Sequence, residues 1–172
     1  MPSKLINFAL FQLGWFSSVL GAANNLPMLG PLAAIPILVF HLARANSPRT
    51  EIKLVAAAVI IGGGFDQLLV SVGYIQYRGS APGYLPLWMI GLWIIFSTTL
   101  NVSLRWMHRR WAVAIIFGLI GGPLSYLGGI RLGAAEYYDA TPALIAMAIG
   151  WGILTPVLLA AAERFDGYKD RI

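Results

Sequence analysis

The sequence contains no cysteine, few charged residues and only two histidines, and each of these shortages excludes a class of protein or site. Without cysteine there are no disulfide bonds, thiolate nucleophiles, iron–sulfur clusters or cysteine-ligated zinc sites. Charged residues make up 11% of the 172 residues, whereas a soluble domain carries roughly a quarter. These charged residues are too few for the surface of a water-soluble globular protein. The soluble, disordered and coiled-coil classes are therefore excluded. His41 and His108 are too few for a histidine-rich metal cage.

Long charge-free runs dominate the sequence. Of the 172 residues, 58% are hydrophobic, and the mean hydropathy is +0.73. A membrane-spanning helix needs about 20 mostly apolar residues. Turn-forming residues at 24–27 divide the first run into two helices. We predict an all-α, single-domain bundle over residues 1–172, with six transmembrane helices at about 5–23, 29–43, 52–77, 85–104, 111–130 and 142–162. Small residues at 21–23 also suit a cleaved signal peptide, but one lysine and an internal glutamine favour a retained first helix.

The basic residues are distributed unevenly among the predicted loops. With the N-terminus inside, the outer loops contain only Arg78 and Arg131. Ten basic residues are then inside: Lys4, Arg44, Arg49, Lys53, Arg105, Arg109, Arg110, Arg164, Lys169 and Arg171. The positive-inside rule therefore predicts that both termini are cytoplasmic. Because topology explains the net charge of +5, we expect no nucleic-acid partner.

One acidic residue, Asp66, is predicted to lie inside the hydrocarbon region, where an ionisable group usually marks function. Tyr126 and Ser125 on the fifth predicted helix lie at about the same depth, and Arg131 is close enough to extend back toward Asp66. Asp66 either handles a substrate or ion directly, or ties the third helix to the fifth. The other acids are expected in loops, at helix ends or in the C-terminal tail: Glu51, Glu136, Asp139, Glu163, Asp166 and Asp170.

Further polar residues form a second layer closer to the inner side. These are Gln12, Thr98, Asn101 and Thr155. They either hold helices together by interhelical hydrogen bonds or form the floor of a cavity below Asp66. His41, His108 and Glu163 lie near the inner rim, where histidines are more often solvated than metal-bound, so we expect no metal and no cofactor.

Glycine pairs with four-residue spacing occur at Gly118 and Gly122, and at Gly129 and Gly133. This spacing lets two helix backbones approach closely. We expect packing within the chain rather than a dimer interface, although the oligomeric state stays open. No nucleotide-binding, serine-hydrolase or zinc-protease motif is present in the sequence.

Four segments together resemble a known family: NFALFQLGWF at 7–16, the isolated Asp66, TTLN at 98–101 and GGPLSY at 121–126. The family is an uncharacterised group of bacterial inner-membrane proteins, described as a domain of unknown function, with the N-terminal pattern NFxxFQxGWF. The resemblance implies a small multi-pass protein of the bacterial inner (cytoplasmic) membrane with no assigned activity. It also implies an association with genes that modify membrane fatty acids.

We therefore expect a protein that handles a lipid or another small apolar substrate, with membrane lipids as its partners. Its pocket would contain Asp66 and Tyr126, together with Gln12, Thr98, Asn101, Ser125, Arg131 and Thr155. As an enzyme, it would use Asp66 as acid or base and Tyr126 as a proton partner.

Two alternatives remain for the function. As a carrier, the protein would couple transport to a proton or cation at Asp66, with broken helices near 62–64 and Pro123. As a scaffold, it would be a non-catalytic subunit of a membrane complex. An apolar pocket that opens sideways to lipid favours the enzyme, and a wet cavity that opens to one aqueous side favours the carrier.

Overall fold

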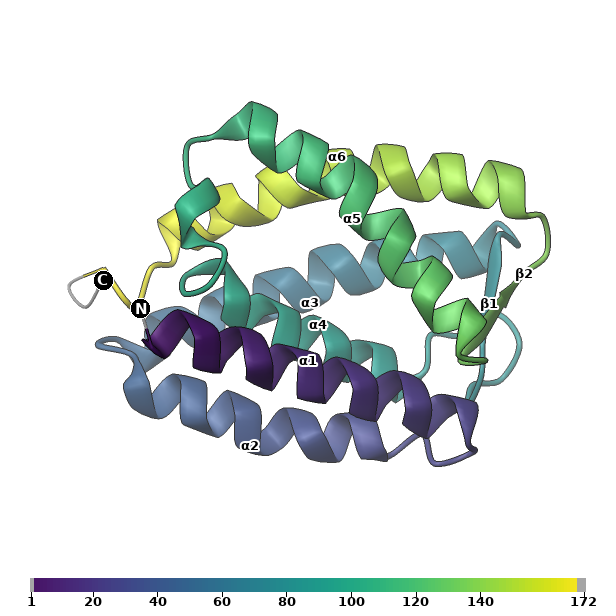
Figure 1. Ribbon diagram of the computed structural model, residues 1–172, viewed down its shortest axis with the longest axis horizontal. Coiled ribbons are helices and arrows are strands. Elements are labelled where there is room, and N and C mark those ends of the chain that lie inside the picture. Colours follow the sequence, from purple (N-terminus) through teal and green to yellow (C-terminus); the bar gives the residue numbers. More distant parts are fainter. Residues whose placement is uncertain (1, 170–172) are drawn as a thin grey trace.

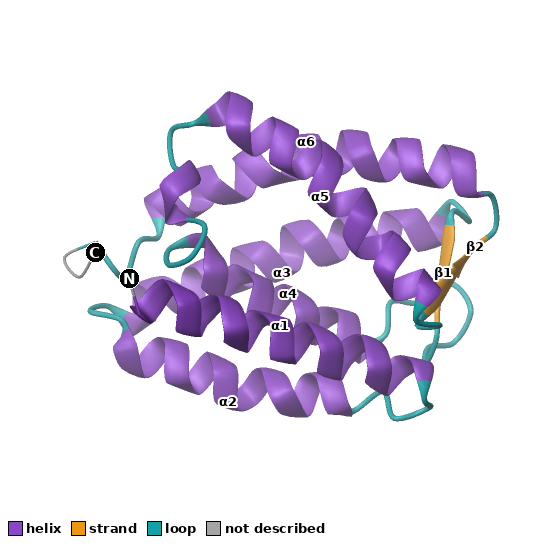
Figure 2. Ribbon diagram, in the orientation of Figure 1, coloured by secondary structure: helices purple, strands orange, loops and turns teal. Residues whose placement is uncertain are grey.

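The computed structural model describes residues 2–169, and long helices account for most of them (Figure 1, Figure 2). The six helices are α1 (Pro2–Ala23), α2 (Leu29–Arg44), α3 (Pro48–Ser71), α4 (Leu87–Leu100), α5 (Trp111–Arg131) and α6 (Ala140–Arg164). A short 3-10 turn, η1 (Arg105–Met107), follows α4. Two short strands, β1 (Ile75–Tyr77) and β2 (Ala135–Tyr137), complete the described elements. The predicted helical class is confirmed, apart from this two-stranded ribbon.

The helices alternate in direction, so the connections gather at two ends of the bundle. The two chain termini and the α2–α3 and α4–α5 connections lie at one end, and the remaining connections lie at the other (Figure 1). We call the first the basic end, because nine basic residues lie in or near its segments: Lys4, Arg44, Arg49, Lys53, Arg105, Arg109, Arg110, Arg164 and Lys169. Arg78 and Arg131 lie at the opposite end, which we call the far end. Asp170 and Arg171 lie outside the described residues.

Four helices, α1, α3, α5 and α6, are long and apolar enough to cross a membrane. The other two are apolar but shorter, with 16 residues in α2 and 14 in α4. At 1.5 Å per residue they extend about 24 Å and about 21 Å, less than the roughly 30 Å of a hydrocarbon core. The count of six spans and its orientation in the membrane stay predictions.

The third predicted helix, expected to continue to Tyr77, ends at Ser71. Gly73 follows with a φ of 74°, a left-handed conformation that glycine adopts without strain and that turns the chain. The next residues form β1, which pairs antiparallel with β2, Ile75 opposite Tyr137 and Tyr77 opposite Ala135. The ribbon lies across the far end of the bundle, where β1 leads from α3 toward α4 and β2 leads from α5 toward α6 (Figure 2).

The fourth predicted helix is also shorter than expected, because α4 ends at Leu100 instead of Leu104. Three consecutive hydroxyl side chains precede this end, and each donates a hydrogen bond of 2.6–2.7 Å to the carbonyl three residues earlier: Ser97, Thr98 and Thr99. Such local bonds compete with continued helix formation.

Close helix packing occurs at the first predicted glycine pair. A Cβ on Gly118 would lie 2.1 Å from the Trp151 carbonyl oxygen, and one on Gly122 would lie 2.3 Å from Trp151 Cγ. These glycines therefore bring α5 against α6 within one chain, as expected. The second pair makes no such contact: Gly129 has open space beside it, and Gly133 occupies a turn with a φ of 88°.

Candidate functional site

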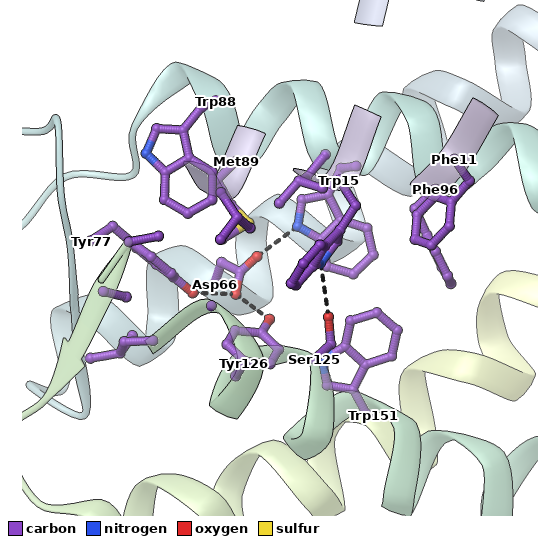
Figure 3. A pocket seen from close by; sticks show the side chains of 17 residues that line it. Phe11, Trp15, Asp66, Tyr77, Trp88, Met89, Phe96, Ser125, Tyr126 and Trp151 are labelled. Atoms are coloured by element: carbon purple, nitrogen blue, oxygen red, sulfur yellow. Dashed lines mark hydrogen bonds between the residues drawn. The ribbon is translucent and has the colours of Figure 1, made fainter. Parts of the chain in front are cut away.

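Asp66 is fully buried near the far end of α3, where it accepts hydrogen bonds from three other elements. Its Oδ1 accepts bonds from the hydroxyls of Tyr77 at 2.8 Å and Tyr126 at 2.5 Å (Figure 3). Its Oδ2 accepts one from Trp93 Nε1 at 2.6 Å. The structure thus brings Asp66 and Tyr126 together as the sequence predicted. It adds two partners, Tyr77 and Trp93, that sequence reasoning missed.

Local features of the chain position these two additional donors. Gly62 lies one helical turn before Asp66, on the same face of α3. An added Cβ on Gly62 would lie 2.3 Å from the Trp93 ring, so the absence of a side chain lets Trp93 lie flat on α3 and reach Asp66. The strand β1 turns Tyr77 back toward α3 from the other side. In the sequence, Gly62 could have indicated a close contact on α3, and Gly73 could have indicated a turn. Neither glycine indicates that Trp93 or Tyr77 is the residue that contacts Asp66.

The partners of Asp66 are all hydrogen-bond donors. An indole N–H can only donate, so the contact with Trp93 requires an acceptor oxygen. Burial, together with the negative charge of Asp66, raises the pKa of the Tyr77 phenol well above its ordinary value of 10.0. The Tyr77 hydroxyl therefore stays protonated and donates a hydrogen bond to Asp66.

Asp66 lies in a cavity enclosed by α1, α3, α4, α5, α6 and the β ribbon (Figure 3). Its volume of about 70 Å³ is room for roughly five water-sized groups. Eight of its seventeen lining residues are aromatic: Phe11, Trp15, Tyr77, Trp88, Trp93, Phe96, Tyr126 and Trp151. The lining is therefore aromatic and apolar, with the polar atoms of Asp66 and its donors in one part of the wall.

The cavity opens between α1 and α5. Ser125 on α5 lines the cavity and is also exposed on the surface, so it lies at the mouth. Trp15 on α1 donates a 3.2 Å hydrogen bond across this opening to Ser125 Oγ. α5 packs mainly on α6, and α1 packs on α2 and α4, so no extensive helix contact closes the gap.

This mouth faces the side of the bundle rather than one of its ends. Trp15 is about 12 Å from the end of α1, and Ser125 is about 9 Å from the end of α5, at 1.5 Å per residue. The neighbouring side chains Phe16 and Leu124 are exposed apolar groups. A ligand that enters here must pass an apolar surface.

The other residues predicted for this pocket lie elsewhere. Only Ser125 joins Asp66 and Tyr126 in the lining, which lacks Gln12, Thr98, Asn101, Arg131 and Thr155. Gln12 is half-buried on α1, and Arg131 is exposed at the end of α5. The prediction rested on equal depth along the helices, which does not decide which face each side chain occupies. The predicted and observed lining residues therefore differ.

Two of the remaining predicted residues are buried against helix backbones. The Thr98 hydroxyl bonds the carbonyl of Ile95, and the Thr98 carbonyl accepts a 3.1 Å bond from the Asn7 side chain. Thr155 Oγ1 is buried at the contact between α5 and α6, close to Gly118. Among the described residues it has no hydrogen-bond partner.

A second acid is buried besides Asp66. Glu51 lies in the first turn of α3, at a helix end as expected, but its side chain is fully buried at the basic end. Its Oε1 accepts bonds from Asn101 Nδ2 at 2.8 Å and the Gly167 amide at 2.7 Å, and its Oε2 lies 2.7 Å from His41 Nε2. Asn101 therefore belongs to this polar cluster. Tyr168 extends it with a bond to the His41 carbonyl oxygen.

The histidines do not come together around an ion. In the part of the chain that the structure describes, no group of three or more histidine, aspartate and glutamate side chains is arranged to hold a metal. His108 Nε2 lies 3.0 Å from the Leu100 carbonyl oxygen, and Glu163 accepts a bond from the Arg109 amide.

Comparison with curated proteins and with solved structures finds no match for this chain. A family model does match it over residues 4–157, which is most of its length. The family carries no assigned function, in agreement with the resemblance that the sequence suggested. The chain belongs to the family described as "Protein of unknown function (DUF2878)".

Proposed function

We propose that this protein binds a lipid or another small lipid-soluble molecule in the cavity around Asp66. The observation that carries the proposal is a buried carboxylate in an aromatic cavity whose mouth opens between α1 and α5. Membrane proteins place ionisable groups at such depth at a cost, and usually for function.

The charge distribution supports a location in the bacterial cytoplasmic membrane with the basic end on the cytoplasmic side. All six helices would then cross the bilayer. The shorter α2 and α4 would do so by local thinning of the bilayer, which costs little per ångström of mismatch. In this orientation the Asp66 cavity lies in the half of the membrane remote from the cytoplasm.

The lateral mouth favours a ligand that arrives from the bilayer. A carrier of water-soluble solutes needs a wet path to one aqueous side, whereas this cavity has a mostly apolar lining. The same geometry suits acid–base chemistry, because the Tyr126 hydroxyl lies 2.5 Å from Asp66 Oδ1, within reach for proton exchange. Asp66 would act as the base and Tyr126 as its proton partner.

Obstruction of the mouth tests the proposal. Ser125→Trp would fill the opening, while Leu124→Trp adds the same side chain to the neighbouring exposed position. The full chain is extracted from membranes in native-lipid particles, and the bound apolar compounds are identified by organic extraction and mass spectrometry. We expect one compound class to be enriched with the parent protein and with Leu124→Trp, and depleted with Ser125→Trp. Identical extracts from all three proteins would support a scaffold role and contradict the proposal.

A further inference from the structure

We infer that the ligand of the Asp66 cavity is an organic cation, an amine or quaternary ammonium group attached to an apolar body. The inference rests on the proposed function and names the chemical class of its ligand. It follows from the charge of the cavity, the chemistry of its walls and its size.

The Asp66 carboxyl group has no basic partner in the cavity wall. Among the lining residues that the structure describes, Asp66 is the only carboxylic acid, and none is a lysine, arginine or histidine. The three groups that contact Asp66 are neutral donors, two phenols and one indole. Hydrogen bonds offset part of the cost of a buried carboxylate, and an ion of opposite charge adds a Coulomb attraction that is strong in a poorly solvated cavity. A ligand with a positive charge supplies that ion.

The walls of the cavity are suited to an organic cation. Four tryptophans are among its eight aromatic residues, and tryptophan has the strongest attraction for a cation above its ring. Trp93 and Trp151 stack at 5.3 Å with 14° between their planes. Phe96 meets both edge-on, at 90° to Trp93 and 82° to Trp151. These contacts fix the three rings in two nearly perpendicular orientations in the wall. Aromatic side chains are also the walls of the cages that bind quaternary ammonium groups.

The same walls are unsuited to an inorganic cation. Calcium and magnesium require about six oxygen ligands. Both oxygens of Asp66 already accept hydrogen bonds, and most of the lining offers carbon atoms. An ammonium group needs no such coordination, because ring faces and a nearby carboxylate attract it without direct ligation.

The size of the cavity suits only the head of such a ligand. A volume of about 70 Å³ accommodates roughly five non-hydrogen groups, comparable with a trimethylammonium head. The apolar body would therefore extend past Trp15 and Ser125 toward the bilayer, which requires their 3.2 Å hydrogen bond to open.

Two probes of equal shape and different charge test this inference. Benzyltrimethylammonium carries a positive charge, and neopentylbenzene replaces its nitrogen with carbon. Binding of each to the full chain is measured by tryptophan fluorescence in a neutral maltoside detergent, without choline lipids. We expect the cation to bind about tenfold more tightly, or better. Equal binding of both would overturn the charge inference and leave the proposed function standing, whereas binding of neither would contradict both.

Variants assign the preference to this cavity. Asp66→Asn should bind both probes alike, and a preference that survives in a folded Asp66→Asn protein would overturn the inference. Trp15→Leu provides a second measurement at the mouth, independent of the folding of Asp66→Asn. Trp15→Leu should weaken binding of the cation severalfold and binding of the neutral probe less. Trp106 is an exposed tryptophan at the basic end, so Trp106→Leu should change the binding of neither probe. Equal losses for both probes in Trp15→Leu would also contradict the inference.

Discussion

His41 Nε2 and Glu51 Oε2 lie 2.7 Å apart, and both side chains are buried at the basic end of the bundle. The contact joins α2 to α3. The second Glu51 oxygen accepts bonds from Asn101, after α4, and from the backbone of Gly167, after α6. One carboxylate thus connects α2, α3 and the segments that follow α4 and α6.

Removal of this carboxylate should destabilise the protein strongly. Glu51→Ala leaves His41, the Asn101 amide and the Gly167 N–H without their acceptor, and loss of one partner from a buried pair costs about 3–5 kcal/mol. Thermal unfolding in detergent measures the loss. Glu163→Ala is the control, because its partner Arg109 is 86% exposed at a distance of 3.5 Å, and such surface pairs contribute about 0–1 kcal/mol. Equal stability of the two variants would show that the Glu51 cluster contributes little.

A larger side chain at Gly122 should disrupt the contact between α5 and α6. Even a Cβ there would lie 2.3 Å from Trp151, so Gly122→Leu forces the helices apart and costs about 1–3 kcal/mol or more. Gly121→Leu is the matched control, because the nearest atom to its Cβ is 3.7 Å away in the Phe117 ring. The thermal midpoint should fall much further for position 122 than for 121. A similar fall at both positions would indicate a general intolerance of leucine in α5.

Asp66→Asn should cost stability through Trp93 in particular. The new amide can still accept from Tyr77 and Tyr126 through one oxygen, but its NH₂ group then faces the indole N–H. Two donors cannot bond, and an unsatisfied buried donor costs about 1–3 kcal/mol. Addition of Trp93→Phe to Asp66→Asn removes that conflict, so the double variant should be more stable than the sum of the two single effects. Simple additivity in this cycle would mean that Asp66 and Trp93 do not interact in the folded protein.

Single cysteines test the membrane topology cleanly, since the chain has none of its own. With six crossings and the basic end inside, cysteines at Leu26, Ala81 and Tyr138 should react with an impermeant thiol reagent in intact spheroplasts. Cysteines at Asn46 and Arg110 should react only after lysis. Labelling of Leu26 and Asn46 from the same side would show that the short helix α2 does not cross.

Charge-free runs and turn-forming residues predicted most helix positions well, because an uncharged run of helical length leaves little choice of structure. The exceptions lie where short-range chemistry stops a helix within an apolar run. The hydroxyl side chains at 97–99 end α4 early. The turn at Gly73 separates the end of α3 from β1. An apolar run shows that a segment can enter a membrane, but local hydrogen bonds decide where its helix ends.

The sequence by itself determined the helical class and the separation of charge between the two ends, since both depend on positions along helices. It also placed Asp66 and Tyr126 at the same depth. The tertiary structure decided which side chains share a cavity. Gln12 and Asn101 have the predicted depth but face other surroundings, while Trp93 and Tyr77 reach Asp66 over Gly62 and around a strand. Glu51 is buried by side chains from α2 and the end of α4 and by the chain after α6, which returns to contact it. Depth follows from the number of residues along a helix, whereas the rotation of each helix and the return of distant segments follow from packing between surfaces.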